Sequence, residues 1–432
     1  MTSQKTLVVG GGLAGPAATY WLSQIPGFHV TLLERSSSMR TTGQQLDLRV
    51  RGIDVMRKMG IDEALRAVRV LEPGVQLIDT TGREQAFFPV ADHGGGRQSM
   101  TSEYEIMRAD FVRILYDLTK DSSNVRHVFG QSVRDFTQDD ESIPHGKVHV
   151  TFSSGQQEDF DMVVCADGTG SKTRKIMLGP DAPDPRHRTN GGYIGYFSIP
   201  SQPQDSDRFT MCLLPGKTSR VIATRKDCKE LTRVYMITSR NDPGVDAALK
   251  SGDLTEMKNA LSELYKDAKW ETKRFMDGLL TDPEADDLYI TPYEEVHLPV
   301  GSWSKGRVVC IGDAAHSGTA NGYGTSWSLI GAYIMAGEIA TRYEKDQSLP
   351  ASAIIEATKK YEEIFRPIAT MGHGKGNSWV GDFFHPRSEF AIGLIHKFAA
   401  AAAYFRLDQR LGFDGQAGKW QLPEYPALGG QH

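Results

Sequence analysis

Within residues 5–34, the pattern of hydrophobic residues changes from that of a strand to that of a helix and back. TLVV and FHVTLLE are short apolar runs rich in β-branched residues, typical of buried strands, and PAATYWLSQI between them is long enough for a helix. The glycine-rich turn GGGLAG joins the first strand to this helix. The pattern therefore predicts one βαβ unit with parallel strands.

The pattern then alternates between helical and strand periods. Helical spacing at 52–69 and 108–120 precedes KVHVTF and DMVVCA, whose β-branched residues favour strands and predict a hairpin. From about residue 186 to 300, short strands separated by turn signals predict a mostly antiparallel sheet. Helical patterns follow within 252–280, the first with apolar side chains at Leu254, Met257, Leu261 and Leu264.

The stretch GRVVCIGDAAH again has the apolar pattern typical of a buried parallel strand. The C-terminal part after it is predicted to be mostly helical. A segment beyond the second sheet therefore completes the first domain. This split predicts that residues 10–15 and 312–326 lie close together. The chain is expected to be an α/β protein.

Composition narrows the class of partner. With 432 residues, the chain exceeds the length at which one core stops growing, so two packed domains and a large ligand site are expected. Hydrophobic residues make up 39% and charged residues 24%, as in ordinary soluble proteins. The net charge is -5, without a dense block of Lys and Arg. We therefore expect no nucleic-acid partner.

Cysteine use and the ends of the chain suggest a cytoplasmic protein. Cys165, Cys212, Cys228 and Cys310 show no CxxC spacing and are expected to be reduced, buried thiols. The first strand begins within the first ten residues, which leaves no room for a signal peptide. Residues 388–410 are largely apolar but lack the roughly 20-residue run of a transmembrane segment. We expect a helix docked on its own protein; a membrane-surface helix is the alternative.

The first motif is GxGxxG, formed by Gly10, Gly12 and Gly15 directly after a strand and at the start of a helix. Glycines in this context let the backbone approach a pyrophosphate, whose charge is stabilised by free amides and the helix dipole. Glu34 closes the next strand, where an acid accepts hydrogen bonds from an adenosine ribose. An incidental glutamate beside a tight turn is the alternative.

Two further strand ends carry glycines and acids. Asp167 and Gly168 follow a strand, although alone they could form only a turn. Asp313 follows a third strand, and Gly322 and Gly324 then precede a helical run. One phosphate loop suffices for a dinucleotide, so these clusters serve either something else or another part of the same ligand. FAD, with its nucleotide, pyrophosphate, polyol and reactive ring, is the expected cofactor.

These three ordered motifs resemble the single-component FAD-dependent aromatic hydroxylases, the group A flavoprotein monooxygenases. GTSWSLIGAYIMAGEIA is most similar to the tetracycline-hydroxylating branch and to fungal secondary-metabolite enzymes. The resemblance implies a Rossmann-like FAD-binding domain of the glutathione-reductase and hydroxybenzoate-hydroxylase type, a mostly antiparallel substrate domain and a C-terminal helix. The expected segments are FAD-binding 1–75, 108–185 and 299–375, substrate-binding 76–107 and 186–298, and C-terminal helical 376–432.

Residue roles are carried over from this resemblance. Glu34 would hold the ribose, Asp313 the ribityl and pyrophosphate region, and Arg108 would contact FAD. Asp47 matches a carboxylate near the flavin, and the Asp167 segment matches a motif linked to FAD pyrophosphate and transient NADPH or NADH binding. Solvated or loop positions are the alternatives for Arg108 and Asp47. The full cofactor-binding set is Gly10, Gly12, Ala14, Gly15, Glu34, Arg35, Asp47, Arg108, Asp167, Gly168, Asp313, Gly322, Gly324 and Thr325.

Other positions allow two interpretations. Tyr193, Tyr196 and Phe197 are candidates for the substrate pocket, with core packing as the alternative. The family usually places a proline after Gly-Asp-Ala-Ala-His, but Ser317 follows His316 here. This departure bears on flavin mobility and oxygen reactivity. The resemblance implies a structural role for His316, with a catalytic acid as the alternative, and no catalytic side chain is assigned.

The resemblance implies an NAD(P)H- and FAD-dependent monooxygenase that inserts one oxygen atom from O2 into an aromatic or polycyclic small molecule, by hydroxylation or epoxidation, in secondary metabolism. No metal motif such as HExxH is present in the sequence. A flavin oxidase or redox-neutral cyclase on the same fold is one alternative, and a nonenzymatic nucleotide-binding protein is another. A halogenase is disfavoured because no WxWxIP-like stretch occurs.

Overall fold

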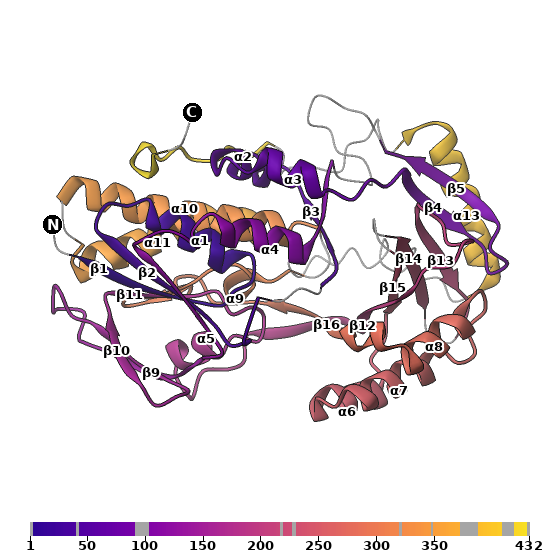
Figure 1. Cartoon of the computed structure of the whole chain (residues 1–432), viewed down its shortest axis with the longest axis horizontal. Helices are drawn as coiled ribbons and strands as arrows, with labels where there is room; N and C mark the ends of the chain where they lie inside the picture. Colours follow the sequence, from indigo (N-terminus) through magenta and orange to yellow (C-terminus); the bar gives the residue numbers. More distant parts are fainter. Residues whose placement is uncertain are drawn as a thin grey trace.

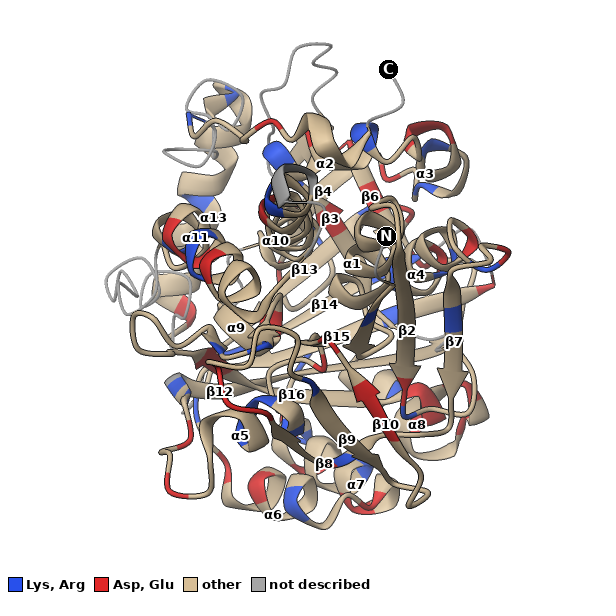
Figure 2. Cartoon of the chain, turned by 90° about the vertical axis from the view of Figure 1, so that its left-hand side faces the viewer, with Lys and Arg blue, Asp and Glu red and all other residues tan. Residues whose placement is uncertain are grey.

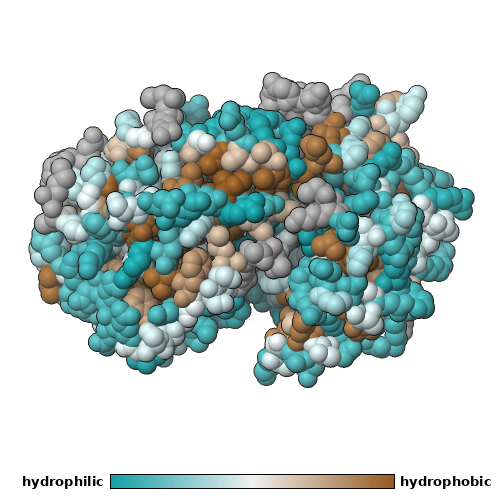
Figure 3. Space-filling model, viewed as in Figure 1, coloured by the Kyte–Doolittle hydropathy of each residue, from teal (hydrophilic) through white to brown (hydrophobic). Residues whose placement is uncertain are grey.

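The computed structural model comprises two domains joined by long strands (Figure 1). It describes residues 3–39, 43–90, 103–216, 219–226, 230–318, 322–346, 349–371, 388–407 and 419–429. In the space-filling view a notch separates the lower parts of the two domains (Figure 3).

A mostly parallel sheet forms the centre of the first domain. Its apolar strands are almost fully buried, as expected for a sheet covered on both faces. The predicted βαβ unit is confirmed, because β1 pairs in parallel with β2 in register from Gln4–Phe28 to Val9–Leu33. The spatial order is β17 (Ser304–Lys305), β18 (Val308–Cys310), β11 (Met162–Cys165), β1 (Gln4–Val9), β2 (Phe28–Glu34) and β7 (Val125–Phe129).

Different layers cover the two faces of this sheet (Figures 1 and 2). The helices on one face are α1 (Ala14–Ser23), α4 (Arg108–Asp117), α10 (Gly324–Asp346) and α11 (Ala351–Ala369). The layer on the other face contains β8 (Val133–Gln138), β9 (Val148–Phe152), β10 (Gln157–Phe160) and α5 (Lys172–Leu178). Trp21 of α1 contacts Tyr333 of α10 edge to face, with ring centroids 5.1 Å apart.

The predicted hairpin between KVHVTF and DMVVCA is wrong. β9 pairs antiparallel with β10, whereas β11 joins the parallel sheet beside β1. The short strand β10, QEDF, is too polar to be distinguished from a loop by its pattern. A third strand therefore separates the two that were expected to pair.

The second domain is built on a seven-stranded sheet. Only the contact between β13 and β4 is parallel, so the mostly antiparallel prediction is confirmed. The spatial order is β16 (Tyr289–Val296), β12 (Arg186–Pro200), β15 (Leu231–Thr238), β14 (Arg220–Lys226), β13 (Phe209–Leu214), β4 (Gly74–Ile78) and β5 (Glu84–Pro89).

Helices cover the outer side of this sheet. Leu261 is buried, and Leu254, Met257 and Leu264 pack beside it, as their helical spacing predicts. The helices are α6 (Pro243–Ser251), α7 (Leu254–Tyr265) and α8 (Thr272–Thr281), followed by the 3-10 turn η1 (Pro283–Asp287). α6 was not predicted. Asp242 caps it by accepting hydrogen bonds from the Gly244 and Val245 amides.

The C-terminal helix α13 (Glu389–Tyr404) docks on the second domain, although the sequence also allowed a membrane-surface helix. Ile392 and Ile395 are buried against Leu213 and Val221 of the sheet. Within the described residues, no helix is both long and apolar enough to span a bilayer. Residues 419–429 lie back on the first domain, where the Tyr425 hydroxyl donates to Glu338 of α10 at 2.8 Å.

Short elements complete the junction between the domains. β3 and β6 form a separate two-stranded sheet, with Leu46 opposite Ile106. The remaining elements are β3 (Gln45–Leu48), α2 (Arg51–Lys58), α3 (Asp62–Val68), β6 (Tyr104–Met107), α9 (Asp313–His316) and η2 (Pro426–Leu428). Cys165, Cys212 and Cys310 are free and buried, as predicted, while Cys228 lies outside the described residues.

Candidate active site at three strand ends

Three neighbouring parallel strands bring the sequence motifs together. β11 lies between β1 and β18, with Cys165 level with Val9 on one side and with Cys310 on the other. The residues after each strand therefore emerge at the same edge of the sheet, where ligands of open α/β sheets bind. The predicted proximity of residues 10–15 and 312–326 is confirmed for the described parts of these segments, 10–15, 312–318 and 322–326.

The first glycine loop lies so close to its neighbours that side chains would clash. A Cβ atom at Gly10, where φ is +116°, would lie 2.4 Å from the carbonyl oxygen of Ala166. A Cβ atom at Gly15 would lie 1.8 Å from the carbonyl oxygen of Gly10. These glycines permit the tight turn and the close contact between helix and strand. Glu34 lies beside the loop and accepts a hydrogen bond from the Gly11 amide at 2.7 Å.

The third strand end abuts this loop. At Gly312, where φ is +57°, a Cβ atom would lie 2.7 Å from Cβ of Ala14. Gly312 is followed by Asp313, whose exposed side chain lines a cavity. Desolvation within this cavity raises the pKa of Asp313, and the nearby positive charge of Arg108 opposes this shift. Arg108 also reaches the glycine loop, with Nη2 3.4 Å from the position of a Cβ atom at Gly12.

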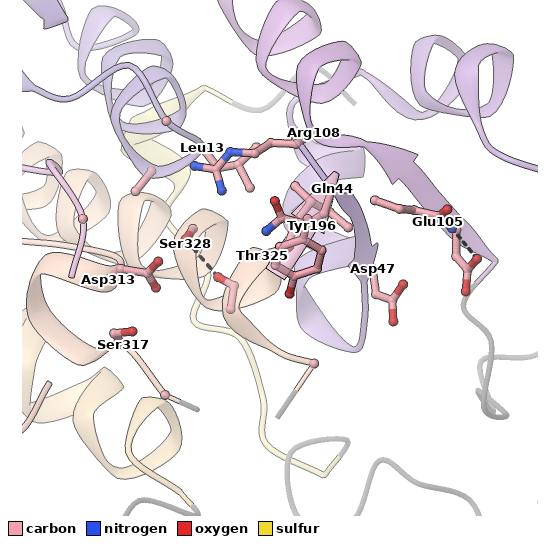
Figure 4. Close-up of a pocket in the computed structure, with 18 of the residues that line it drawn as sticks. Leu13, Gln44, Asp47, Glu105, Arg108, Tyr196, Asp313, Ser317, Thr325 and Ser328 are labelled. Carbon is pink, nitrogen blue, oxygen red and sulfur yellow. Dashed lines mark hydrogen bonds between the residues drawn. The ribbon is translucent and has the colours of Figure 1, made fainter. Parts of the chain in front are cut away.

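The cavity has a volume of about 580 Å³ and extends between the two domains (Figure 4). Asp313 and Ser317 lie on one side in this view, and Asp47 and Glu105 lie on the other. The predicted residues that line it are Gly12, Ala14, Asp47, Arg108, Gly168, Tyr196, Asp313, Gly322, Gly324 and Thr325. Gly10 and Gly15 belong to the glycine loop but are not among the cavity-lining residues.

Asp167 has a different place from its neighbour Gly168. Its carboxylate accepts hydrogen bonds from the Ser171 hydroxyl and, at 2.6 Å, from the Thr173 hydroxyl. It therefore supports the start of α5 and is not among the cavity-lining residues, whereas Gly168 is. Arg35 is exposed and also lies off the cavity wall.

The three aromatic candidates on β12 separate according to the two faces of the strand. Tyr196 lines the cavity. Tyr193 is fully buried on the helix-covered side, and its hydroxyl donates to the carbonyl of Asp242 at 3.2 Å. Phe197 is 2% exposed in the same core and borders a small second cavity of about 110 Å³. Because successive side chains of a strand point to opposite faces of the sheet, Tyr196 faces the cavity and Tyr193 faces the core.

His316 belongs to an aromatic cluster behind the site. Its ring lies 5.1 Å from that of Trp303 and 5.2 Å from that of Phe365. It is 2% exposed and is not among the cavity-lining residues, consistent with the structural role expected for it. Ser317, in the place of the family's proline, accepts a hydrogen bond from the Thr169 hydroxyl at 3.1 Å. Residues 319–321 lie outside the described part of the chain.

Sequence reasoning missed the polar wall at the second-domain end of the cavity. Gln45, Glu105 and Arg225 line it, from strands β3, β6 and β14. No linear motif marks these residues, because three separate strands bring them together. Val75, Phe209 and Met211 add an apolar surface from the large sheet.

The residues fit FAD. The missing side chains at the glycine loop leave room for backbone amides to approach a pyrophosphate, and Arg108 supplies a cation beside them. Asp313 offers a carboxylate to ligand hydroxyls at the adjacent strand end. The fold and this site define a flavoprotein of the dinucleotide-binding α/β class.

Comparisons with known proteins agree. The family model described as FAD binding domain matches residues 3–349. The flavin-dependent monooxygenase eupH of Phoma sp is 43% identical over 99% of this chain and 98% of its own length. The FAD-dependent monooxygenase asL4 of Sarocladium schorii is 35% identical, covering 99% of both chains. The crystal structure of tetracycline destructase Tet(55) is 26% identical, with a TM-score of 0.75 over 98% of this chain and 100% of that one.

The chain belongs to the FAD-binding-domain family, and within it to the FAD-dependent monooxygenases.

Proposed function

We propose that the protein uses NADPH or NADH and O2 to insert one oxygen atom into an aromatic or polycyclic small molecule of secondary metabolism. The observation that carries this proposal is a single cavity that extends from the dinucleotide loop at Gly12 to the large sheet at Tyr196 and Met211. A cofactor bound at the loop and a substrate bound against the large sheet would therefore meet in one cleft. The fungal monooxygenases among the relatives support the assignment to secondary metabolism.

FAD would be held along the three strand ends. The Gly10–Gly15 loop and Arg108 would bind the pyrophosphate, and Glu34 would accept from the ribose. Asp313 would bind a hydroxyl of the polyol chain, and the amides from Gly322 to Thr325 would face the ring at the start of α10. When bound, FAD supplies electron transfer from a nicotinamide and the activation of O2.

The residues of the chain would position the substrate and exclude water from it. Tyr196, Phe209 and Met211 form an apolar wall that would exclude water and orient a flat substrate. The large sheet closes the side of the cavity opposite the glycine loop. Exclusion of water matters here, because activated oxygen is otherwise lost as hydrogen peroxide.

The test is substrate-dependent oxidation of NADPH and NADH by the purified holoenzyme in air, with hydrogen peroxide measured alongside. We expect a phenolic polycyclic compound to accelerate oxidation of the reductant and to yield a product heavier by one oxygen atom. Substrate oxidation that requires no nicotinamide and produces equimolar hydrogen peroxide would instead establish the flavin oxidase alternative.

A further inference from the structure

The turn between β3 and α2 has a strained backbone. Val50 has φ of +43° and ψ of -130°, close to the first central position of a type II′ turn, where glycine is favoured. The Gly52 amide donates to the Arg49 carbonyl at 3.0 Å and closes the turn. A β-branched residue at positive φ is strained and persists only where the surrounding structure fixes its backbone. Contacts from outside the turn must therefore hold it.

Ser326, in the first turn of α10, supplies such contacts. Its hydroxyl accepts a hydrogen bond from the Arg49 amide at 2.8 Å and donates to the Arg49 carbonyl at 2.9 Å. Ser326 is fully buried. Gly52 leaves room for it, because a Cβ atom at Gly52 would lie 2.7 Å from both Cβ and Oγ of Ser326. One hydroxyl thus fixes the amide and the carbonyl of a residue 277 positions away in the sequence.

The side chain of Arg49 extends from this turn toward the start of α10. Its Nη2 donates to Asp47 Oδ2 at 2.9 Å, and its Nε lies 3.8 Å from the position of a Cβ atom at Gly322. Asp47, Gly322 and Thr325 line the cavity, whereas Arg49 is not among the lining residues. The Arg49 guanidinium therefore compensates, from behind, the charge of the Asp47 carboxylate on the cavity wall.

This compensation bears on the reduction potential of a bound flavin. Charges held near the ring tune its potential, and they act strongly where the surroundings are partly buried. Reduction brings two electrons into the ring, so an Asp47 carboxylate without its guanidinium would oppose reduction by repulsion. A carboxylate paired with Arg49 opposes it far less. The position of the Arg49 guanidinium decides between these two situations.

We propose that Ser326 is a positioning residue for FAD: by fixing the backbone of Arg49, it keeps the guanidinium on the Asp47 carboxylate and so raises the reduction potential of the bound flavin. This inference rests on the proposed function, because it takes the flavin ring to lie at the start of α10. Ser326 is not among the cavity-lining residues and acts through Arg49. The strained turn at Val50 is the backbone geometry that this contact imposes.

The midpoint potential of FAD in the purified holoenzyme tests the proposal, measured by anaerobic reduction beside a reference dye. Ser326→Ala removes one hydroxyl and no charge. We expect its potential to be more negative than that of wild type by about 30 mV or more, which corresponds to a tenfold loss in affinity for reduced relative to oxidised FAD. Arg49→Met should shift the potential in the same direction. An unchanged or more positive potential in Ser326→Ala contradicts the proposal.

The double variant Ser326→Ala with Arg49→Met shows whether Ser326 acts through Arg49. Its potential should equal that of Arg49→Met alone, because the hydroxyl then has no guanidinium to position. Shifts that add in the double variant would mean that Ser326 affects the flavin by another route, against the proposal.

Thr358→Val is the control for the loss of a buried hydroxyl. Thr358 is fully buried on α11, and its hydroxyl donates to the Ile355 carbonyl at 3.1 Å. This variant should lose stability but keep the wild-type potential. An equal shift in Thr358→Val would reduce the effect of Ser326→Ala to a general loss of stability and would overturn the positioning role.

Gly52→Ala disturbs the same contact without removing a hydrogen-bonding group, and it replaces Ser326→Ala if that variant does not fold. The added methyl group meets Ser326 and displaces it from Arg49. The potential should again become more negative. A wild-type potential in Gly52→Ala argues against the proposal.

The positioning role and the proposed function fail separately in these experiments. A holoenzyme that hydroxylates a substrate, but whose potential is the same in wild type and Ser326→Ala, overturns only the role of Ser326. A holoenzyme that shows the expected shifts but oxidises no nicotinamide with any compound overturns the proposed function alone.

Discussion

Gly312 and Ala14 lie against each other where the ends of β18 and β1 meet, because a Cβ atom at Gly312 would lie 2.7 Å from Cβ of Ala14. The contact closes the edge at which β1 and β18 end. It also holds Asp313 beside the glycine loop. A small side chain at either position is therefore a condition for the site.

Gly312→Ala should weaken FAD binding and lower stability, because the added methyl group meets Ala14 and the backbone has φ of +57°. We expect a loss of about 1–3 kcal/mol in the free energy of unfolding, as for an overpacked core position. Gly170→Ala is the control, since nothing lies within 4 Å of its Cβ position. Thermal unfolding and flavin titration measure both effects, and equal behaviour of the two variants would contradict the packing argument.

Asp313→Ala should raise the dissociation constant of FAD about 10- to 100-fold, the range expected for losing a hydrogen bond to a charged group. Flavin fluorescence, which changes when FAD leaves the protein, gives the constant. Asp167→Asn provides the contrast, because the Asp167 carboxylate supports α5 through Ser171 and Thr173. It should lower the melting temperature more than it lowers FAD affinity. Normal FAD affinity in Asp313→Ala would remove Asp313 from the binding site.

Ionisation of the Glu72 carboxyl should lower the free energy of unfolding as pH rises. Burial, with Glu105 nearby, raises its pKa from 4.5 to about 8 in the folded chain, against the opposing effect of Arg225. Between these two values the folded state holds the additional proton. The free energy of unfolding therefore falls with increasing pH, by at most about 1.4 kcal/mol per pH unit. The penalty is absent below the lower value and complete above the higher one.

Glu72→Gln removes this titration. The stability of the variant relative to wild type should increase steadily between about pH 5 and 8, measured by urea unfolding at each pH. A constant difference between Glu72→Gln and wild type across this range would mean that Glu72 is ionised in the folded chain.

Tyr196 and Tyr193 should separate substrate binding from stability. Tyr196→Ala removes part of the cavity wall and should raise KM for a polycyclic substrate about tenfold. Tyr193→Phe removes the hydrogen bonds between the Tyr193 hydroxyl and the backbone of Asp242 and should cost about 1 kcal/mol of stability with KM unchanged. Steady-state kinetics and thermal unfolding on both variants test the pair. Opposite results would mean that β12 presents its other face to the cavity.

Features that depend on residues close together in the sequence could be predicted, whereas features that depend on tertiary contacts could not. Gly10, Gly12 and Gly15 impose local backbone geometry, so their motif and the βαβ unit could be recognised directly. Asp313 could be placed because parallel strands end at one edge of a sheet. The carboxylate of Asp167 could not, since its hydrogen bonds depend on how α5 begins.

The polar wall at the second-domain end of the cavity could not be predicted from local sequence. Gln45, Glu105 and Arg225 come from different strands, and each sits in a short stretch with no distinctive pattern. Only tertiary packing places one guanidinium between two carboxylates. The strand β10 was missed for a related reason, because its pairing with β9 outweighs its polar composition.

The most direct test of the central claim is the fate of heavy-isotope O2. The holoenzyme is supplied with NADPH and a phenolic polycyclic substrate such as 2-naphthol, and the mass of the product is measured by mass spectrometry. The predicted result is one labelled oxygen atom per product molecule, with one NADPH oxidised for each. Reductant consumed with all label recovered in hydrogen peroxide, or product oxygen derived from water, would contradict the account.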